Sequence, residues 1–165
     1  MSQENRYYAG IGSRDTPDNI QVLIGMVAKR MARKKWILRS GGARGADMAF
    51  EEACDKAGGK KEIFRPEDSN KESLELASTI HPIWRACNIW AKRAHARNCQ
   101  IILGKELDIP VKFVVCWTPR GKKTGGTRTG IILAESRKIP VYNLGDQDSI
   151  GLVLSNITKH INKGE

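Results

Sequence analysis

The sequence predicts an α/β fold, in which a mostly parallel β-sheet is flanked by helices. Short apolar runs alternate with amphipathic helical segments along the chain. Three of these runs end in a loop that leads into a helix, as repeated strand–helix–strand units do. At 165 residues, the chain suits one domain with its own core.

The chain begins with a predicted strand and helix. Residues 6–11 are apolar enough for a central strand. Thr16-Pro17-Asp18 predicts a helix start, with Thr16 as the cap and proline at the first helical position. The apolar residues of this helix recur at helical spacing, namely Ile20, Leu23, Ile24, Val27 and Met31.

A second and a third strand are predicted over residues 36–40 and 61–64. The helix between them stops at Gly58-Gly59. It presents a face of mostly small residues, which allows close packing on a sheet: Ala46, Ala49, Phe50, Ala53 and Ala57.

The second half continues the alternation. Residues 72–100 are helical in pattern, with a break at His81-Pro82 and one apolar side. That side carries Ile80, Ile83, Trp84, Cys87, Ala91 and Ala94. Residues 111–117 are nearly all apolar, as in a strand buried on both faces. The remaining predicted elements are a helix over 129–138, a strand over 140–143 and a helix over 149–161.

The composition favours an anionic partner. Twenty-eight Lys and Arg against eighteen Asp and Glu give a formal charge of +10, which suits a phosphate-bearing ligand, although a basic surface can also serve solubility alone. No apolar run approaches ~20 residues, the length of a membrane span. Residues 1–5 show no signal-peptide pattern. We therefore expect a cytoplasmic protein without membrane contact.

The cysteines and histidines predict no metal site. Cys54, Cys87, Cys99 and Cys116 lack CxxC spacing, and His81, His95 and His160 are scattered. Four reduced, mostly buried thiols are expected, and no cofactor.

Residues 36–47, WILRSGGARGAD, form the most informative stretch. A strand ends in a serine and two glycines, and a helix begins at once. Such a loop brings backbone N–H groups and the positive end of the helix dipole to one place, which suits an anion. Gly41, Gly42 and Gly45 could also make a tight turn and nothing more. Arg44, inside the turn, favours phosphate.

Three loops should converge. Residues 12–15, 40–45 and 118–127 each follow a predicted strand, so they open on the carboxyl edge of a parallel sheet. They and the following turn supply cations and hydroxyls: Arg14, Arg44, Arg120, Lys122, Lys123, Arg128, Ser13, Ser40, Thr124 and Thr127. Neither GxxxxGK[ST] nor a complete dinucleotide-binding GxGxxG pattern is present.

Several motifs together resemble the SLOG superfamily. They are Gly10-Ile11-Gly12-Ser13-Arg14, the SGGARGAD stretch from Ser40 to Asp47, Arg97-Asn98, Gly125-Gly126-Thr127 and Ile139-Pro140-Val141. Within it the chain is most similar to the DprA/Smf proteins and to small YspA-type proteins common in phages. The resemblance implies one Rossmann-like domain over residues 1–165, commonly a homodimer, that binds nucleotides or, in DprA, single-stranded DNA.

The resemblance also implies a ligand site. The residues carried over by motif are Arg14, Ser40, Gly41, Arg44, Asp47, Arg97, Asn98, Gly126 and Thr127. The loop argument adds Gly12, Ser13, Gly42, Gly45, Trp117, Thr118 and Gly125. Trp117 lies at a strand end and is as readily core as base-stacking, whereas Trp84 and Trp90 have helical spacing that favours core positions.

Catalysis is not expected. The LONELY GUY phosphoribohydrolases of the superfamily carry PGGxGTxxE, whereas this chain has no glutamate after Gly126 until Glu135. Similar deoxyribosyltransferases place a glutamate where Gly130 stands. Asp47 or Asp15 could substitute, but Asp47 is better suited to hold Arg44 or a ribose hydroxyl.

The leading hypothesis is therefore a protein that binds single-stranded nucleic acid or a free nucleotide in a basic, glycine-rich pocket. Lys92, Arg93, Lys122 and Lys123 would supply further cations along a phosphate backbone. A nucleotide-processing enzyme is the alternative, and sequestration of a nucleotide-derived signal is a third possibility.

Overall fold

Five parallel strands form one sheet in the order β3-β2-β1-β4-β5. The computed structural model describes residues 6–163, so residues 1–5, where no signal peptide is expected, lie outside it. The strands are β1 (Tyr7–Gly12), β2 (Ile37–Ser40), β3 (Lys60–Ile63), β4 (Val114–Trp117) and β5 (Val141–Asn143). The predicted α/β fold with a parallel sheet is confirmed.

The strand order reverses beside β1. The chain adds β2 and β3 on one side of β1 and then returns to place β4 on the other, with Gly12 opposite Trp117. In open α/β sheets such a switch point leaves a crevice at the carboxyl ends of the two strands, which is where ligands bind. The register thus brings the loops after β1 and β4 together.

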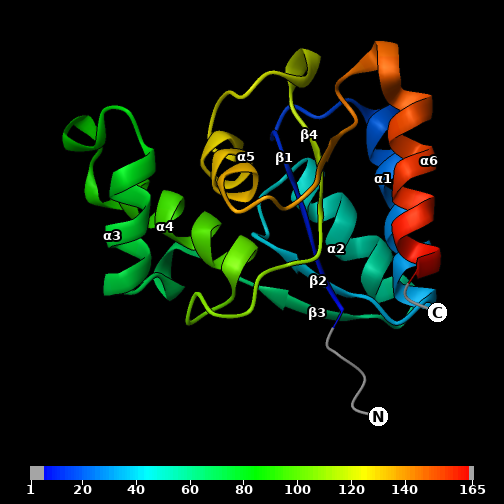
Figure 1. The fold of residues 1–165 in the computed structure, drawn as a ribbon, viewed down its shortest axis with the longest axis horizontal. Helices are drawn as coiled ribbons and strands as arrows, with labels where there is room; N and C mark the ends of the chain where they lie inside the picture. The colour runs from blue at the N-terminus through cyan, green and yellow to red at the C-terminus, as the bar shows by residue number, and fades with distance from the viewer. Residues whose placement is uncertain (1–5, 164–165) are drawn as a thin grey trace.

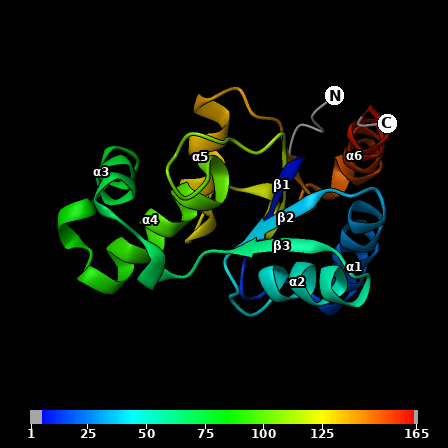
Figure 2. The ribbon, with the colours of Figure 1, turned by 90° about the horizontal axis from the view of Figure 1, so that it is seen from below.

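Helices cover both faces of the sheet (Figures 1 and 2). One face carries α1 (Asp18–Arg33), α2 (Ala46–Lys56) and α6 (Ile150–Lys163). The other carries α4 (Ile89–Leu103) and α5 (Thr127–Ser136), with α3 (Lys71–Ile80) packed outside α4. The sheet separates two apolar cores, one centred on Tyr8, Phe50 and Phe113, the other on Val114, Ile101 and Ile102.

Two local predictions are wrong. Thr16 does not cap α1, because its hydroxyl donates to the Ser13 carbonyl at 2.6 Å and Pro17 takes the cap position. The predicted apolar side over residues 80–94 is not continuous. After α3 ends, the chain turns through the short helix η2 (Trp84–Ala86), and Ile83 is 65% exposed. The side chain of Asn88 then caps α4 by accepting from the Ala91 N–H at 2.8 Å.

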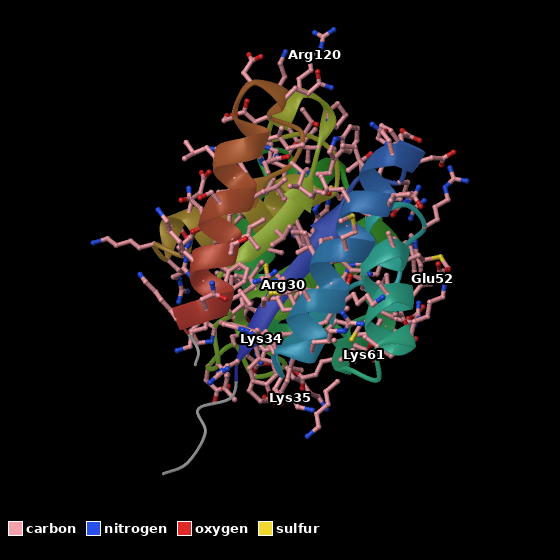
Figure 3. The ribbon with its side chains drawn as sticks, turned by 90° about the vertical axis from the view of Figure 1, so that its right-hand side faces the viewer. Arg30, Lys34, Lys35, Glu52, Lys61 and Arg120 are labelled. Carbon is pink, nitrogen blue, oxygen red and sulfur yellow. The ribbon has the colours of Figure 1, made fainter. Side chains whose placement is uncertain are left out.

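The positive charge is spread over the molecule. Figure 3 shows Arg120 at the end of the molecule where β4 finishes, and Lys34 and Lys35 at the opposite end. The net charge therefore does not by itself locate a ligand site. None of the helices within residues 6–163 has the length and apolarity that a bilayer crossing needs.

Candidate functional site

A pocket of about 520 Å³ opens at the carboxyl edge of the sheet, at the switch point between β1 and β4. Its volume lies in the usual range for small-ligand sites. The loops after β1, β2 and β4 and one side of α4 supply its walls. The lining includes nine of the residues expected from the sequence: Gly12, Ser13, Arg14, Asp47, Arg97, Asn98, Gly125, Gly126 and Thr127.

The other expected residues do not line the pocket: Ser40, Gly41, Gly42, Arg44, Gly45, Trp117 and Thr118. Several of them have packing roles. The Ser40 hydroxyl is buried and donates to the Gly10 carbonyl at 2.6 Å. The Thr118 hydroxyl accepts from Asn143 Nδ2 at 2.7 Å. Trp117 packs partly buried against the core that holds Tyr8. The Arg44 side chain is exposed.

The glycine loop after β2 already holds an anion, the carboxylate of Asp47. This residue is only 6% exposed, and its Oδ2 accepts from the Ala43 N–H at 3.4 Å. Burial raises the pKa of Asp47 to about 6, although Arg97 and hydrogen bonds from backbone N–H groups, including those of Gly12 and Gly41, act to lower it. The N–H groups predicted to receive a phosphate are therefore partly committed to the chain's own side chain.

The buried side chain of Arg97 connects the loop after β2 with the loop after β3. Its Nη1 donates to the Gly41 carbonyl at 2.9 Å and to the Phe64 carbonyl at 3.1 Å, and its Nε donates to Asn98 Oδ1 at 2.8 Å. Asn98 Nδ2 in turn donates to the Gly126 carbonyl at 2.7 Å. The Arg97-Asn98 pair thus fixes the loop after β2 against the loop after β4. Burial lowers the pKa of Arg97, and Asp47 partly opposes this.

The loops after β1 and β2 touch through their backbones. Gly45 has φ +85°, and a Cβ there would lie 2.5 Å from the Ser13 carbonyl oxygen. A Cβ on Gly12 would lie 2.7 Å from the Trp117 carbonyl oxygen. These glycines are required for close approach of the chain to itself. In contrast, no atom lies within 4 Å of a Cβ placed on Gly125 or Gly126 among the residues that the structure describes.

The open anion position lies at the start of α5. This helix has ten residues, and no side chain caps it within the described part of the chain. The first N–H groups of a helix lack internal partners and attract negative charge. Residues 124–127 line the pocket at this point, and Arg14 lines it as well. A phosphate placed there would meet backbone N–H groups, the Thr127 hydroxyl and one guanidinium.

The pocket lining is less basic than the sequence suggested. Arg14 and Arg97 are matched in number by Asp15 and Asp47. Lys123, expected to be available for a ligand, forms an ion pair with Glu135. Further positive charge comes from Arg65, which lies outside the lining and, like Arg14, acts to lower the pKa of Arg97.

One wall was missed by the sequence analysis. Ala91, Ala94 and His95 of α4 line the pocket, at helical spacing with Asn98. The helical spacing of Ala91 and Ala94 was the only available signal, and it predicted an apolar side of the helix rather than a pocket wall. His95 Nδ1 forms a hydrogen bond with Thr129 Oγ1 at 2.8 Å. Burial, His81 and the nearby arginines 97 and 128 lower the pKa of His95.

Two histidines and a cysteine lie together beside this wall. His81, Cys87 and His95 have ligand atoms that all lie within 4.8 Å of one another. The prediction that the histidines are scattered is therefore wrong for His81 and His95. The break at Pro82 turns the chain back towards α4 and brings His81 close to His95. The prediction of free thiols is confirmed, with Cys54, Cys99 and Cys116 buried and Cys87 half-buried.

Comparisons with known proteins agree with the fold. No protein-family model and no curated protein matches the chain. DNA processing protein A from Helicobacter pylori, whose structure was described for its single-stranded DNA binding mode, is similar with a TM-score of 0.61 at 18% identity, over 96% of this chain and 80% of that one. The protein of the same name from Streptococcus pneumoniae is similar with a TM-score of 0.55 at 17% identity, over 84% of this chain. This chain spans about half of the Streptococcus protein, 49% of it. The Rossmann-like fold implied by the resemblance is confirmed.

Proposed function

We propose that this protein binds single-stranded nucleic acid, with one backbone phosphate held at the start of α5. The observation that carries the proposal is the uncapped N-terminus of α5 in a pocket that Arg14 also lines. Helix N-termini and arginine forks are the usual protein partners of phosphate. The likeness in fold to a protein described for single-stranded DNA binding supports a nucleic acid as the ligand.

An exposed tryptophan beside the pocket suits a polymer. Trp90 is 53% exposed and directly precedes Ala91, which lines the pocket. The other two candidates are less available, since Trp117 packs against the core and Lys92 Nζ lies 5.6 Å from the centre of the Trp84 ring. Base stacking on an aromatic side chain contributes about 1–3 kcal/mol per base and tolerates any sequence. We assign this role to Trp90.

The ligand class is tested by salt dependence. Affinity for a fluorescent single-stranded 20-mer and for a mononucleotide is measured over a range of salt concentrations. For the 20-mer, log affinity should fall with log salt by about 0.7 per neutralised phosphate, and the mononucleotide should give a shallower line. Equal affinities with weak salt dependence would exclude nucleic acid as the ligand and leave a free nucleotide.

The stacking role is tested in the same assay. Trp90→Ala should weaken 20-mer binding by about tenfold, within the range for one stacked base, and leave mononucleotide binding unchanged. Leu152→Ala is a matched control, because Leu152 is 64% exposed on α6, which covers the opposite face of the sheet. Equal effects of the two substitutions would show that Trp90 does not contact the bases.

A nucleotide-processing enzyme is the second candidate, and Asp47 is the observation that favours it. Its carboxylate lines the pocket, and burial raises its pKa to about 6. A carboxyl group with such a pKa can exchange a proton near neutral pH.

Two further predictions from the sequence, a homodimer and a cytoplasmic location, stay predictions.

A further inference from the structure

The half-buried cluster of His81, Cys87 and His95 contains the donor set of a zinc site. The three residues come from the end of α3, the end of η2 and the second turn of α4. The Cys87 sulfur lies 3.8 Å from both ring nitrogens of His81, and the ring centres of His81 and His95 are 4.4 Å apart. Imidazole nitrogen and thiolate sulfur are the ligands that zinc prefers.

The spacing is close to what the metal needs. Zinc binds sulfur at about 2.3 Å and nitrogen at about 2.0–2.1 Å, so the ligand atoms of a tetrahedral site lie roughly 3.5 Å apart. The separations of the Cys87 sulfur from the His81 nitrogens exceed this by a few tenths of an ångström. All the ligand atoms of the three residues lie within 4.8 Å of one another, so side-chain rotations that close a gap of at most about 1.3 Å would form the site.

Each histidine has a partner that bears on its orientation. His95 Nδ1 is held by the Thr129 hydroxyl at 2.8 Å, which leaves Nε2 for a metal. Zinc-bound histidines usually have such a second hydrogen bond. His81 is held less firmly, because its Nδ1 accepts from the Ile83 N–H at 3.2 Å. It can bind through Nδ1 by giving up that contact, or through Nε2 after a change of tautomer.

We propose that His81, Cys87 and His95 form a zinc site at the wall of the pocket, with a fourth coordination position open to the pocket. His95 is the link, since it belongs both to the cluster and to the pocket lining. Three protein ligands with one open position are typical of zinc sites that bind water or a ligand oxygen. The role of the open fourth position rests on the proposed function, in which the pocket binds the ligand. The binding of zinc by the three side chains does not depend on that function.

Cobalt spectroscopy tests the site without any nucleic acid. Untagged full-length protein is stripped with a chelator and titrated with Co²⁺. One ion per chain should bind, with a thiolate-to-cobalt charge-transfer band and the visible bands of tetrahedral cobalt, and Zn²⁺ should displace it. Cys87→Ser should remove the charge-transfer band, and His81→Gln should weaken the visible bands. Absence of both bands from the unsubstituted protein would overturn the proposal.

Matched variants show whether the effect is local. Cys54→Ser and His160→Gln change the same residue types outside the cluster and should leave the cobalt spectrum unchanged. Thr129→Val keeps the side-chain shape but removes the hydroxyl that holds His95, and should weaken zinc binding about 10- to 100-fold. Circular dichroism confirms that each variant is folded. A spectrum equally altered by Cys54→Ser and Cys87→Ser would overturn the assignment.

Inorganic phosphate tests the open position. If phosphate can enter from the pocket, its addition to the cobalt-loaded protein should shift the visible bands while the charge-transfer band remains. Unchanged visible bands at saturating phosphate would show that the fourth position is closed to the pocket. Nucleic-acid binding is measured separately on metal-free protein, so its failure and the failure of the zinc site are distinguishable.

Discussion

The side chains of Asp47 and Arg97 both lie against Gly41. A methyl group placed on Gly41 would lie 2.8 Å from Asp47 Oδ2 and 2.9 Å from Arg97 Nη1. Both side chains are almost fully buried, and both are hydrogen-bonded to backbone groups of the same loop. The carboxylate and the guanidinium together shape the loop after β2. Backbone N–H groups of this loop, which were predicted to bind a phosphate, are therefore partly occupied by the Asp47 carboxylate.

Gly41→Ala should lower the free energy of unfolding by about 2 kcal/mol, within the usual range for overpacking. The physical reason is that a Cβ would displace both charged groups from their buried hydrogen bonds. Urea denaturation measures the change. Gly126→Ala is the control, because Gly126 has helical φ and ψ and no described atom lies within 4 Å of an added Cβ. Equal losses in the two variants would contradict this account of Gly41.

Arg14→Ala should weaken mononucleotide binding by about 1.5–3 kcal/mol, the range for a hydrogen bond to a charged partner. Arg14 lines the pocket, whereas Arg44 is exposed outside the lining. Arg44→Ala should therefore change affinity less than twofold. Isothermal titration calorimetry compares the two variants. A larger loss for Arg44→Ala would place the phosphate at the glycine turn, as the sequence alone suggested.

The Asp47 carboxyl should contribute a rise in the free energy of unfolding as pH falls from about 7 to about 4. The pKa of Asp47 is raised from 3.8 to about 6 in the folded protein, so the folded state binds the proton more tightly than the unfolded state. The ionised carboxylate therefore costs stability at neutral pH, by up to about 3 kcal/mol. Urea titrations at several pH values compare the protein with Asp47→Asn. The variant should lack this rise, and parallel curves would contradict the assignment.

The protein should release no free base from nucleoside monophosphates. Gly130, which stands where the deoxyribosyltransferases resembled by the sequence place a glutamate, is buried, and a Cβ there would lie 3.1 Å from Ile11 Cδ1. Groups that bind phosphate equally in the ground and transition states do not accelerate the reaction. Chromatography of the incubated nucleotides is the measurement. Turnover near ~1 s⁻¹ that Asp47→Asn abolishes in a folded, ligand-binding variant would establish an enzyme.

The alternation of strands and helices was predictable because it depends on local periodicity. The convergence of the loops after β1, β2 and β4 followed from parallel topology, which places strand ends on one edge. The partner of Asp47 was not predictable, because Arg97 lies fifty residues further along the chain and packing alone brings them together. Periodicity also cannot distinguish a helix face that meets the core from one that meets a cavity, so Ala91 and Ala94 were predicted only as part of an apolar side.

The contrast between the glycines of the three loops determines where the pocket can adapt. The loops after β1 and β2 have no space between their backbones, so hydrogen exchange there should require opening of the whole fold. Gly125 and Gly126 have open surroundings within the described residues. We therefore expect conformational adjustment on ligand entry near Gly125 and Gly126, in the exposed segment 122–126. Replacing residues 122–126 with a different loop sequence should therefore change which ligand binds, while the sheet and both cores keep their stability.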